Sequence, residues 1–170
     1  MFGSKKEEAR IIKWYPKWLD LNPEPHIFSN GVSTYLVYSC HEGSENLGHH
    51  HITVLDEVNE TNYPYAIIQL KGCIAHRFET LEERFFKYMP LWDTGLKRHH
   101  AHVIENSKWL SDAKDIHEGE KNFNKKQWVN KEHYVLLFHE NALEFLADGF
   151  ETEVVRCSEP MLFSHLCKQL

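Results

Sequence analysis

The stretch 133–148 constrains the fold more than any other part of the chain. Two apolar segments in it flank the dipeptide Glu140-Asn141. Because Asn tolerates a positive φ, this dipeptide predicts a two-residue hairpin turn. If residue 139 faces residue 142, apolar and aromatic side chains fill one face, and the histidine positions lie on the other face. The stretch therefore predicts two antiparallel strands with one apolar face.

The same register sets the side-chain pairs on both faces of the hairpin. Phe138 then lies opposite Leu143 on the apolar face, and His133 lies opposite Asp148 on the other face. A carboxylate beside an imidazole raises the histidine pKa and orients the ring as a base, so His133 and Asp148 are the candidate catalytic residues. The structural alternative is a polar pair at the rim of the sheet, which contributes little to stability.

Further strands are indicated by apolar patterns upstream. Residues 32–40 are rich in β-branched and aromatic side chains and residues 49–58 begin with an alternating pattern, so we expect these two strands to pair antiparallel. Residues 65–78 are largely apolar, which is typical of a central strand. With the hairpin, these segments predict an α+β fold: a mainly antiparallel sheet of about five strands, with helices packed on one face or at the ends.

Helices are expected at the start of the chain and between the strands. Residues 1–25 predict an N-terminal helical arm followed by a proline-containing connector. Thr80 and Glu83 match a capping box and predict a short helix after them. Two further helices are expected at 107–119 and 160–170. A chain of 170 residues is expected to form a single domain.

Composition limits the classes of function. The formal net charge is −6, whereas binding to nucleic-acid phosphates needs a basic face, so we expect no nucleic-acid partner. The four cysteines form no C-x-x-C pair and the first ten residues include no apolar run, which indicates reduced thiols in a cytoplasmic protein. No apolar run is long enough to span a membrane. A lysine-rich stretch with Phe123 and Trp128 is interpreted as a surface loop rather than a single-strand binding site.

Thirteen histidines are the strongest chemical signal, and several of them fall in two clusters. In a strand, His49 and His51 share one face. Around His102, a strand would add His100 to the same face and a helix would add His99. Neutral imidazole suits Zn²⁺ or Fe²⁺, so these five histidines are candidate ligands of a divalent transition metal. The alternative is an exposed polar segment in each place, because only two ligands are visible locally.

Three functions follow as hypotheses. The aromatic content, with Trp14 and Trp18 in the arm, and the lack of a complete catalytic motif favour a non-catalytic ligand- or protein-binding domain that associates with itself as a homodimer. Neither H-E-x-x-H nor G-x-S-x-G is present. The alternative is a metal-dependent enzyme built on the histidines. A pH-responsive module would use the same histidine excess. A small-molecule ligand is compatible with the first two.

Overall fold

The computed structural model describes residues 5–57 and 63–170, and its contacts divide the chain into two compact units. Unit 1 comprises Met1–Lys13 and Gly72–Gly149, and unit 2 comprises Trp14–Lys71 and Phe150–Leu170. Each unit contains one five-stranded sheet. The expected α+β class with mainly antiparallel strands is confirmed, and the strands form two sheets rather than one. The expectation of a single domain stays a prediction.

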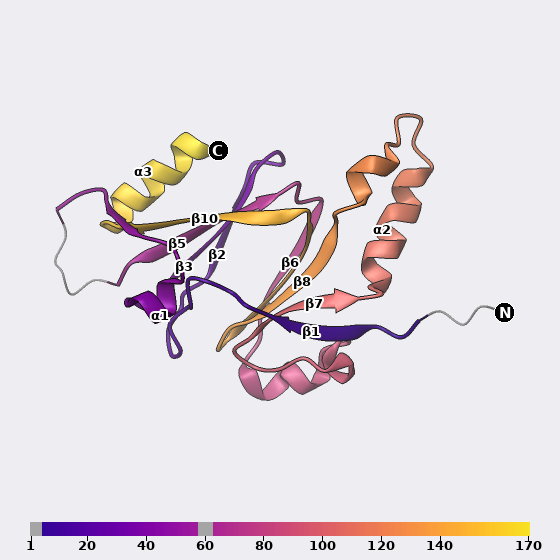
Figure 1. Ribbon diagram of the computed structural model, residues 1–170, viewed down its shortest axis with the longest axis horizontal. Helices are drawn as coiled ribbons and strands as arrows, with labels where there is room; N and C mark the ends of the chain where they lie inside the picture. The colour runs from indigo at the N-terminus through magenta and orange to yellow at the C-terminus, as the bar shows by residue number, and fades with distance from the viewer. Residues whose placement is uncertain (1–4, 58–62) are drawn as a thin grey trace. The chain divides into compact units, whose positions relative to one another are not determined.

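Unit 1 is built on a sheet in the order β1-β7-β8-β9-β6, in which all neighbours are antiparallel (Figure 1). Its strands are β1 (Glu8–Ile12), β6 (Ala75–Thr80), β7 (Ala101–Glu105), β8 (Glu132–Leu137) and β9 (Asn141–Ala147). Its helices are α2 (Lys108–Glu118) and the 3-10 helices η1 (Glu83–Tyr88), η2 (Trp92–Thr94) and η3 (Lys125–Trp128).

The hairpin β8–β9 confirms the expected strands and corrects their register. The Phe138 N–H donates to Asn141 O at 2.9 Å, so the turn residues are His139 and Glu140, one position earlier than expected. Moving a two-residue turn by one position shifts the pairing by two residues, which keeps every side chain on its expected face. Leu136 consequently pairs with Leu143, and Leu146 rather than Asp148 lies opposite His133.

One face of the unit 1 sheet carries both a hydrophobic cluster and polar groups. Val135 and Leu137 of β8 pack in a buried cluster with Phe86 of η1 and Ile104 of β7. Side chains alternate along a strand, so His133 belongs to the same face as Val135. The face is therefore apolar beneath η1 and polar where α2 approaches β8.

The expected N-terminal helical arm is wrong. Residues 8–12 form the edge strand β1, in which Ile11 pairs with His102 of β7. Trp14 and Trp18 are buried, and the Trp14 indole N–H donates to Tyr38 Oη at 2.9 Å. A β-sheet partner overrides the helical spacing here because tertiary pairing outweighs local propensity. The two tryptophans are core residues of unit 2 and do not form an exposed anchor.

Unit 2 is built on a sheet in the order β2-β3-β5-β10-β4 (Figure 1). Its strands are β2 (His26–Ser29), β3 (Thr34–Ser39), β4 (Ile52–Val54), β5 (Tyr65–Lys71) and β10 (Gly149–Arg156), and its helices are α1 (Ser44–Leu47) and α3 (Glu159–Gln169). Leu162 and Leu166 of α3 pack on Tyr35, Ile67 and Val155, which forms the core of this sheet.

Two strand predictions in this region are wrong. The strand expected at 49–58 is the three-residue β4, which pairs parallel with β10 and not with β3; residue 58 lies outside the described residues. The strand expected at 65–78 is divided at Gly72 into β5 and β6, which belong to different sheets. Gly72 has φ +56, and a Cβ there would lie 2.1 Å from Asp148 Oδ2, so glycine permits this break.

The helix predictions hold better where a cap is present. Ser107 caps α2, and its Oγ accepts the Leu110 N–H at 3.1 Å. Pro160 lies in the first turn of α3. Thr80 does not cap a helix, since it ends β6, and the 3-10 helix η1 follows without a side-chain cap. Among the described residues, no helix is both long enough and apolar enough to cross a membrane.

Candidate functional site

The candidate site of unit 1 is a buried polar network centred on His133. This side chain is 1 % exposed, and both ring nitrogens have protein partners. Nδ1 lies 2.8 Å from Ser107 Oγ, and Nε2 lies 3.1 Å from Glu144 Oε2. The three residues come from the cap of α2, from β8 and from β9, so the network links three elements of the unit.

The hydrogen bonds of Ser107 and Glu144 satisfy both ring nitrogens of His133. Ser107 Oγ accepts the Leu110 N–H and also bonds His133 Nδ1, while the Glu144 carboxylate bonds Nε2. A buried polar side chain requires such partners.

Aromatic and cationic groups lie over the network. The Trp109 ring meets the His133 ring edge-on, with 5.0 Å between centroids. The Arg77 guanidinium lies 4.0 Å from the centre of the Trp109 ring, a cation–π contact. In the register of β6 and β9, Arg77 lies opposite Glu144. The indole thus lies between the imidazole and a surface cation.

A cavity of about 850 Å³ opens beside the same helix cap. Its lining includes Ser107 and two further polar residues, Asn106 and Ser111. The charged side chains are four lysines and two acids: Lys5, Lys6, Lys108, Lys114, Glu7 and Asp112. Glu7 Oε1 accepts the Lys108 N–H at 2.6 Å. Leu110 and Trp128 add apolar surface to the lining, and its charged side chains include more cations than anions.

The geometry of the network fits a structural role better than nucleophilic catalysis. A serine–histidine–carboxylate series is also the arrangement of a nucleophile with its base. However, Ser107 is only 6 % exposed, and its oxygen is occupied as the cap of α2. The expected partner of His133, Asp148, instead accepts from Lys131 Nζ at 2.7 Å. The network therefore fastens α2 to the sheet.

His102 is also buried, at 0 % exposure, but it is less well satisfied. Its Nε2 accepts the Lys97 N–H at 3.0 Å, while Nδ1 makes no hydrogen bond of normal geometry. Burial lowers the pKa of His102 to about 4, and the backbone of Val135 partly opposes this shift. The His100 ring lies 6.3 Å away and its Nδ1 contacts Arg98 O. His102 lies within β7, whereas His100 precedes the strand and is exposed, so the expected strand pair of His100 and His102 does not form.

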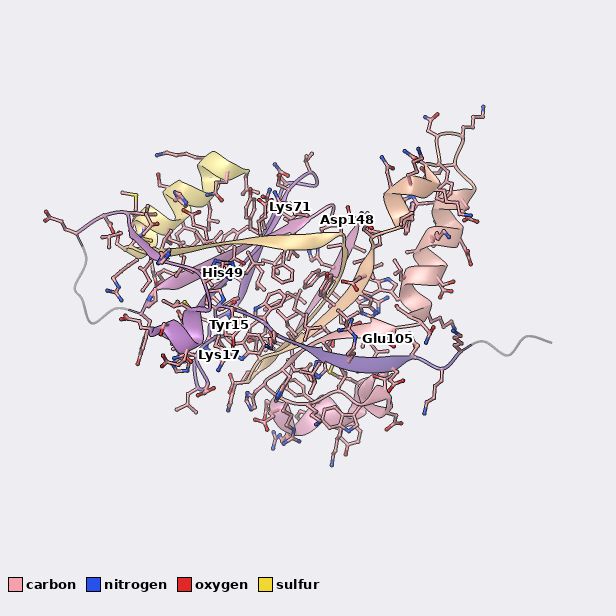
Figure 2. The ribbon with its side chains drawn as sticks, in the orientation of Figure 1. Tyr15, Lys17, His49, Lys71, Glu105 and Asp148 are labelled. Carbon is pink, nitrogen blue, oxygen red and sulfur yellow. The ribbon has the colours of Figure 1, made fainter. Side chains whose placement is uncertain are left out.

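The cluster at 49–51 does not form the expected strand face. His49 and His51 precede β4, which begins at Ile52, and His49 follows α1 (Figure 2). The His49 and His50 rings lie 4.1 Å apart, and burial lowers the pKa of His50. The two histidine clusters belong to different units. Within residues 5–57 and 63–170, no three His, Cys, Asp or Glu side chains form a group arranged to hold a metal.

One grouping of histidines was not anticipated from the sequence. Glu83 Oε2 lies 3.4 Å from His99 Nε2 and 4.0 Å from His139 Nε2. Arg98 Nη1 contacts the other oxygen of the same carboxylate at 2.8 Å. His99 has φ +58, a backbone conformation that is uncommon outside glycine. No sequence signal connects these three positions: Glu83 begins η1, His99 lies in the turn before β7, and His139 lies in the turn between β8 and β9.

Ser107 and Glu144 were also missed as site residues, for different reasons. Ser107 was recognised only as a helix cap. Glu144 was placed on the correct face but two residues out of register, opposite Leu137. In the structure it pairs with Val135, which brings its carboxylate next to His133 Nε2. Comparison with protein family models, curated proteins and solved structures gives no match, so the functional argument depends on the residues themselves.

Proposed function

We propose that this protein is a non-catalytic ligand- or protein-binding domain that associates with itself as a homodimer. The observation that carries the proposal is the outer edge of β6, the last strand of the unit 1 sheet. Five of its six residues are exposed, and Phe78 is 37 % exposed on this strand. An exposed strand edge presents unpaired N–H and C=O groups that a second strand can pair with.

Several observations support a binding role over catalysis. The polar groups of Ser107, His133 and Glu144 are buried and mutually bonded. Burial raises the pKa of Cys40 to about 12 and that of Cys157 to about 11, so neither thiol is a ready nucleophile. A cytoplasmic location remains part of the proposal. For a small-molecule ligand, the cavity beside the cap of α2 offers the volume, and the excess of lysines in its lining favours a negatively charged compound.

Self-association is tested by the mass of the full chain in solution. Sedimentation velocity over about a hundredfold range of concentration should reveal a concentration-dependent dimer. Phe78→Pro removes an N–H on the exposed edge, where proline is tolerated, so it should yield a monomer with an unchanged circular dichroism spectrum. A wild-type chain that stays monomeric at the highest concentration contradicts the proposal.

A metal-dependent enzyme remains the second candidate function. Glu83, His99 and His139 come nearest to a ligand set for it, but no group of three among the described residues is arranged to hold a metal. Around tetrahedral Zn²⁺ with bonds of about 2.0–2.2 Å, neighbouring ligand atoms lie about 3.3 Å apart. The nitrogen–oxygen distances of 3.4 and 4.0 Å approach that spacing. The candidate ranks second because Arg98 already neutralises the carboxylate. Zn²⁺ or Fe²⁺ would be the metal for these ligands.

Zinc titration by calorimetry of protein without an affinity tag tests this second candidate. One equivalent of Zn²⁺ should bind, and His99→Ala should weaken binding at least about tenfold. His117→Ala, which removes an imidazole from α2, is the matched control and should leave binding unchanged. Failure of the wild-type chain to bind Zn²⁺ excludes this site.

A further inference from the structure

We infer that two copies of this chain pair β6 with β6, antiparallel, about a two-fold axis at Phe78, so that Arg77 of each copy lies opposite Glu79 of the other. The inference rests on the proposed self-association and specifies its surface and register. It follows from three features of β6: the direction of its backbone groups, the order of its charges and the position of its exposed aromatic ring.

The backbone hydrogen bonds show which positions of β6 face outward. The Leu81 N–H donates to Glu140 O at 2.9 Å and continues the β6–β9 register. In an antiparallel ladder, bonded positions alternate, so Ala75, Arg77 and Glu79 also bond toward β9. The N–H and C=O groups of the alternate positions therefore point away from the sheet, and these positions are His76, Phe78 and Thr80.

The hairpin supports the same assignment independently. The Phe138 N–H donates to Asn141 O, which directs the backbone groups of Leu143 and Phe145 toward β8. The intervening residues of β9 must then bond toward β6. Glu144 is one of these, and it is the partner of Arg77. Both ladders thus leave the same three positions of β6 at the outer edge.

Charge selects one register for a second copy. A two-fold axis perpendicular to the sheet keeps each face continuous. It lies between the two strands, so one residue of β6 is opposite its own copy. An axis at Arg77 would place Arg77 opposite its own copy, and an axis at Glu79 would do the same with two carboxylates. An axis at Phe78 places Arg77 opposite Glu79 twice, and opposite charges across strands are favourable.

The selected register also satisfies the backbone and both faces of the sheet. His76 lies opposite Thr80 of the second copy, and about six hydrogen bonds form between the two strands. On one face, Arg77 lies between Glu144 of its own chain and Glu79 of the second copy. On the other face, the exposed Phe78 rings meet at the axis, each next to the buried Leu143.

The other outer edge of this sheet is less suited to the same role. In β1, Arg10 already forms an ion pair with Glu105 at 2.9 Å, and Glu105 lies beside β1 (Figure 2). For Arg77 and Glu79, the described residues supply no ion-pair partner within 4.0 Å. Neither charge is thus neutralised by an ion pair among the described residues, and Arg77 is held on the Trp109 ring by its cation–π contact.

Charge reversal and charge exchange test the register. Arg77→Glu and Glu79→Arg should each weaken dimerisation about tenfold or more, because each places two pairs of like charges across the strands. The double variant Arg77→Glu/Glu79→Arg restores opposite charges and should recover most of the wild-type affinity. An equimolar mixture of the two single variants should form a heterodimer, because both of its charge pairs are attractive. One pair has the wild-type order of charges, and in the other pair the two charges are exchanged.

The matched control is Arg10→Glu, the same substitution on the opposite edge of the sheet, which should leave the dimer dissociation constant unchanged within about twofold. If both single variants weaken the dimer and the double variant does not recover, the register is wrong. If the dimer forms but ignores all β6 changes, the surface is wrong and self-association stands. If the wild-type chain never dimerises, the proposed function fails with it. Circular dichroism of each variant separates these outcomes from unfolding.

Discussion

Two histidines of unit 1 have the same burial and different surroundings. His133 on β8 and His102 on β7 are both about fully buried, and they lie on the same face of one sheet. Both nitrogens of His133 meet polar side chains, Ser107 and Glu144. Only one nitrogen of His102 has a regular partner, the Lys97 N–H.

Burial alone does not define the role of a histidine. A histidine with partners at both nitrogens holds secondary-structure elements together, because its removal leaves those buried partners without a hydrogen bond. A side chain that is buried with few partners resists protonation, and burial lowers the pKa of His102 accordingly. His133 therefore has a structural role, and His102 makes the stability of the fold sensitive to acid.

The largest expected contrast comes from the same substitution at both positions. His133→Leu leaves the Glu144 carboxylate buried without its partner and should cost about 3 kcal/mol of unfolding free energy. His102→Leu replaces a poorly satisfied polar ring by an apolar side chain of similar size and should cost less than about 1.5 kcal/mol. Urea denaturation followed by tryptophan fluorescence measures both. Equal losses would remove the distinction drawn between the two histidines.

Acid should expose the second largest difference. The pKa of His102 in the folded chain is about 4, below its ordinary value of 6.5, so the unfolded state binds the proton first as the pH falls. The stability contribution is complete above pH 6.5 and is lost as the pH falls toward 4, with about 2 kcal/mol gone at pH 5. Urea denaturation at pH 7.5 and pH 5 measures it.

His102→Leu is the control for that acid effect, because it removes the titrating ring and keeps the other histidines. The variant should lose about 2 kcal/mol less than the wild type between the two pH values. If wild type and variant lose stability in parallel, other histidines or carboxylates carry the pH dependence, and the assignment to His102 is wrong.

The cap of α2 gives a smaller effect on the His133 side. Ser107→Ala removes both the acceptor of the Leu110 N–H and the partner of His133 Nδ1, and it should cost about 1 kcal/mol. Ser111→Ala, in the same helix and exposed, is the matched control and should be neutral within about 0.5 kcal/mol. Equal behaviour of the two serines would show that the network adds nothing beyond helix propensity.

The sequence predicted the sheet face of each side chain better than its partner on the neighbouring strand. Alternation in 133–148 placed His133 and Glu144 on the correct face, because the period of a strand is two. The partner depends on which two residues form the turn, and both Glu140-Asn141 and His139-Glu140 fit the composition. A difference of one residue in the turn exchanged Asp148 for Glu144 at the imidazole.

Long-range pairing accounts for the other failures. Nothing local in residues 8–12 opposes a helix, and the strand exists because β7 is beside it. The apolar run 65–78 gave no sign that Gly72 would divide it between two sheets. By contrast, the cap at Ser107 is a local signal, since serine bonds a nearby backbone N–H. The cap at Ser107 was predictable from local chemistry, whereas the capping box expected at Thr80 did not form because Thr80 ends β6.

The smallest expected effect is that of His100 on the pKa of His102. His100 lies 6.3 Å from it, and its positive charge when protonated helps to lower the His102 pKa. His100→Ala should therefore raise the His102 pKa slightly, while stability at pH 7 changes by less than about 0.5 kcal/mol because the side chain is exposed. Histidine proton shifts in an NMR titration report the pKa directly. A lower His102 pKa in this variant would mean that His100 supports the protonated ring, which reverses the electrostatic argument.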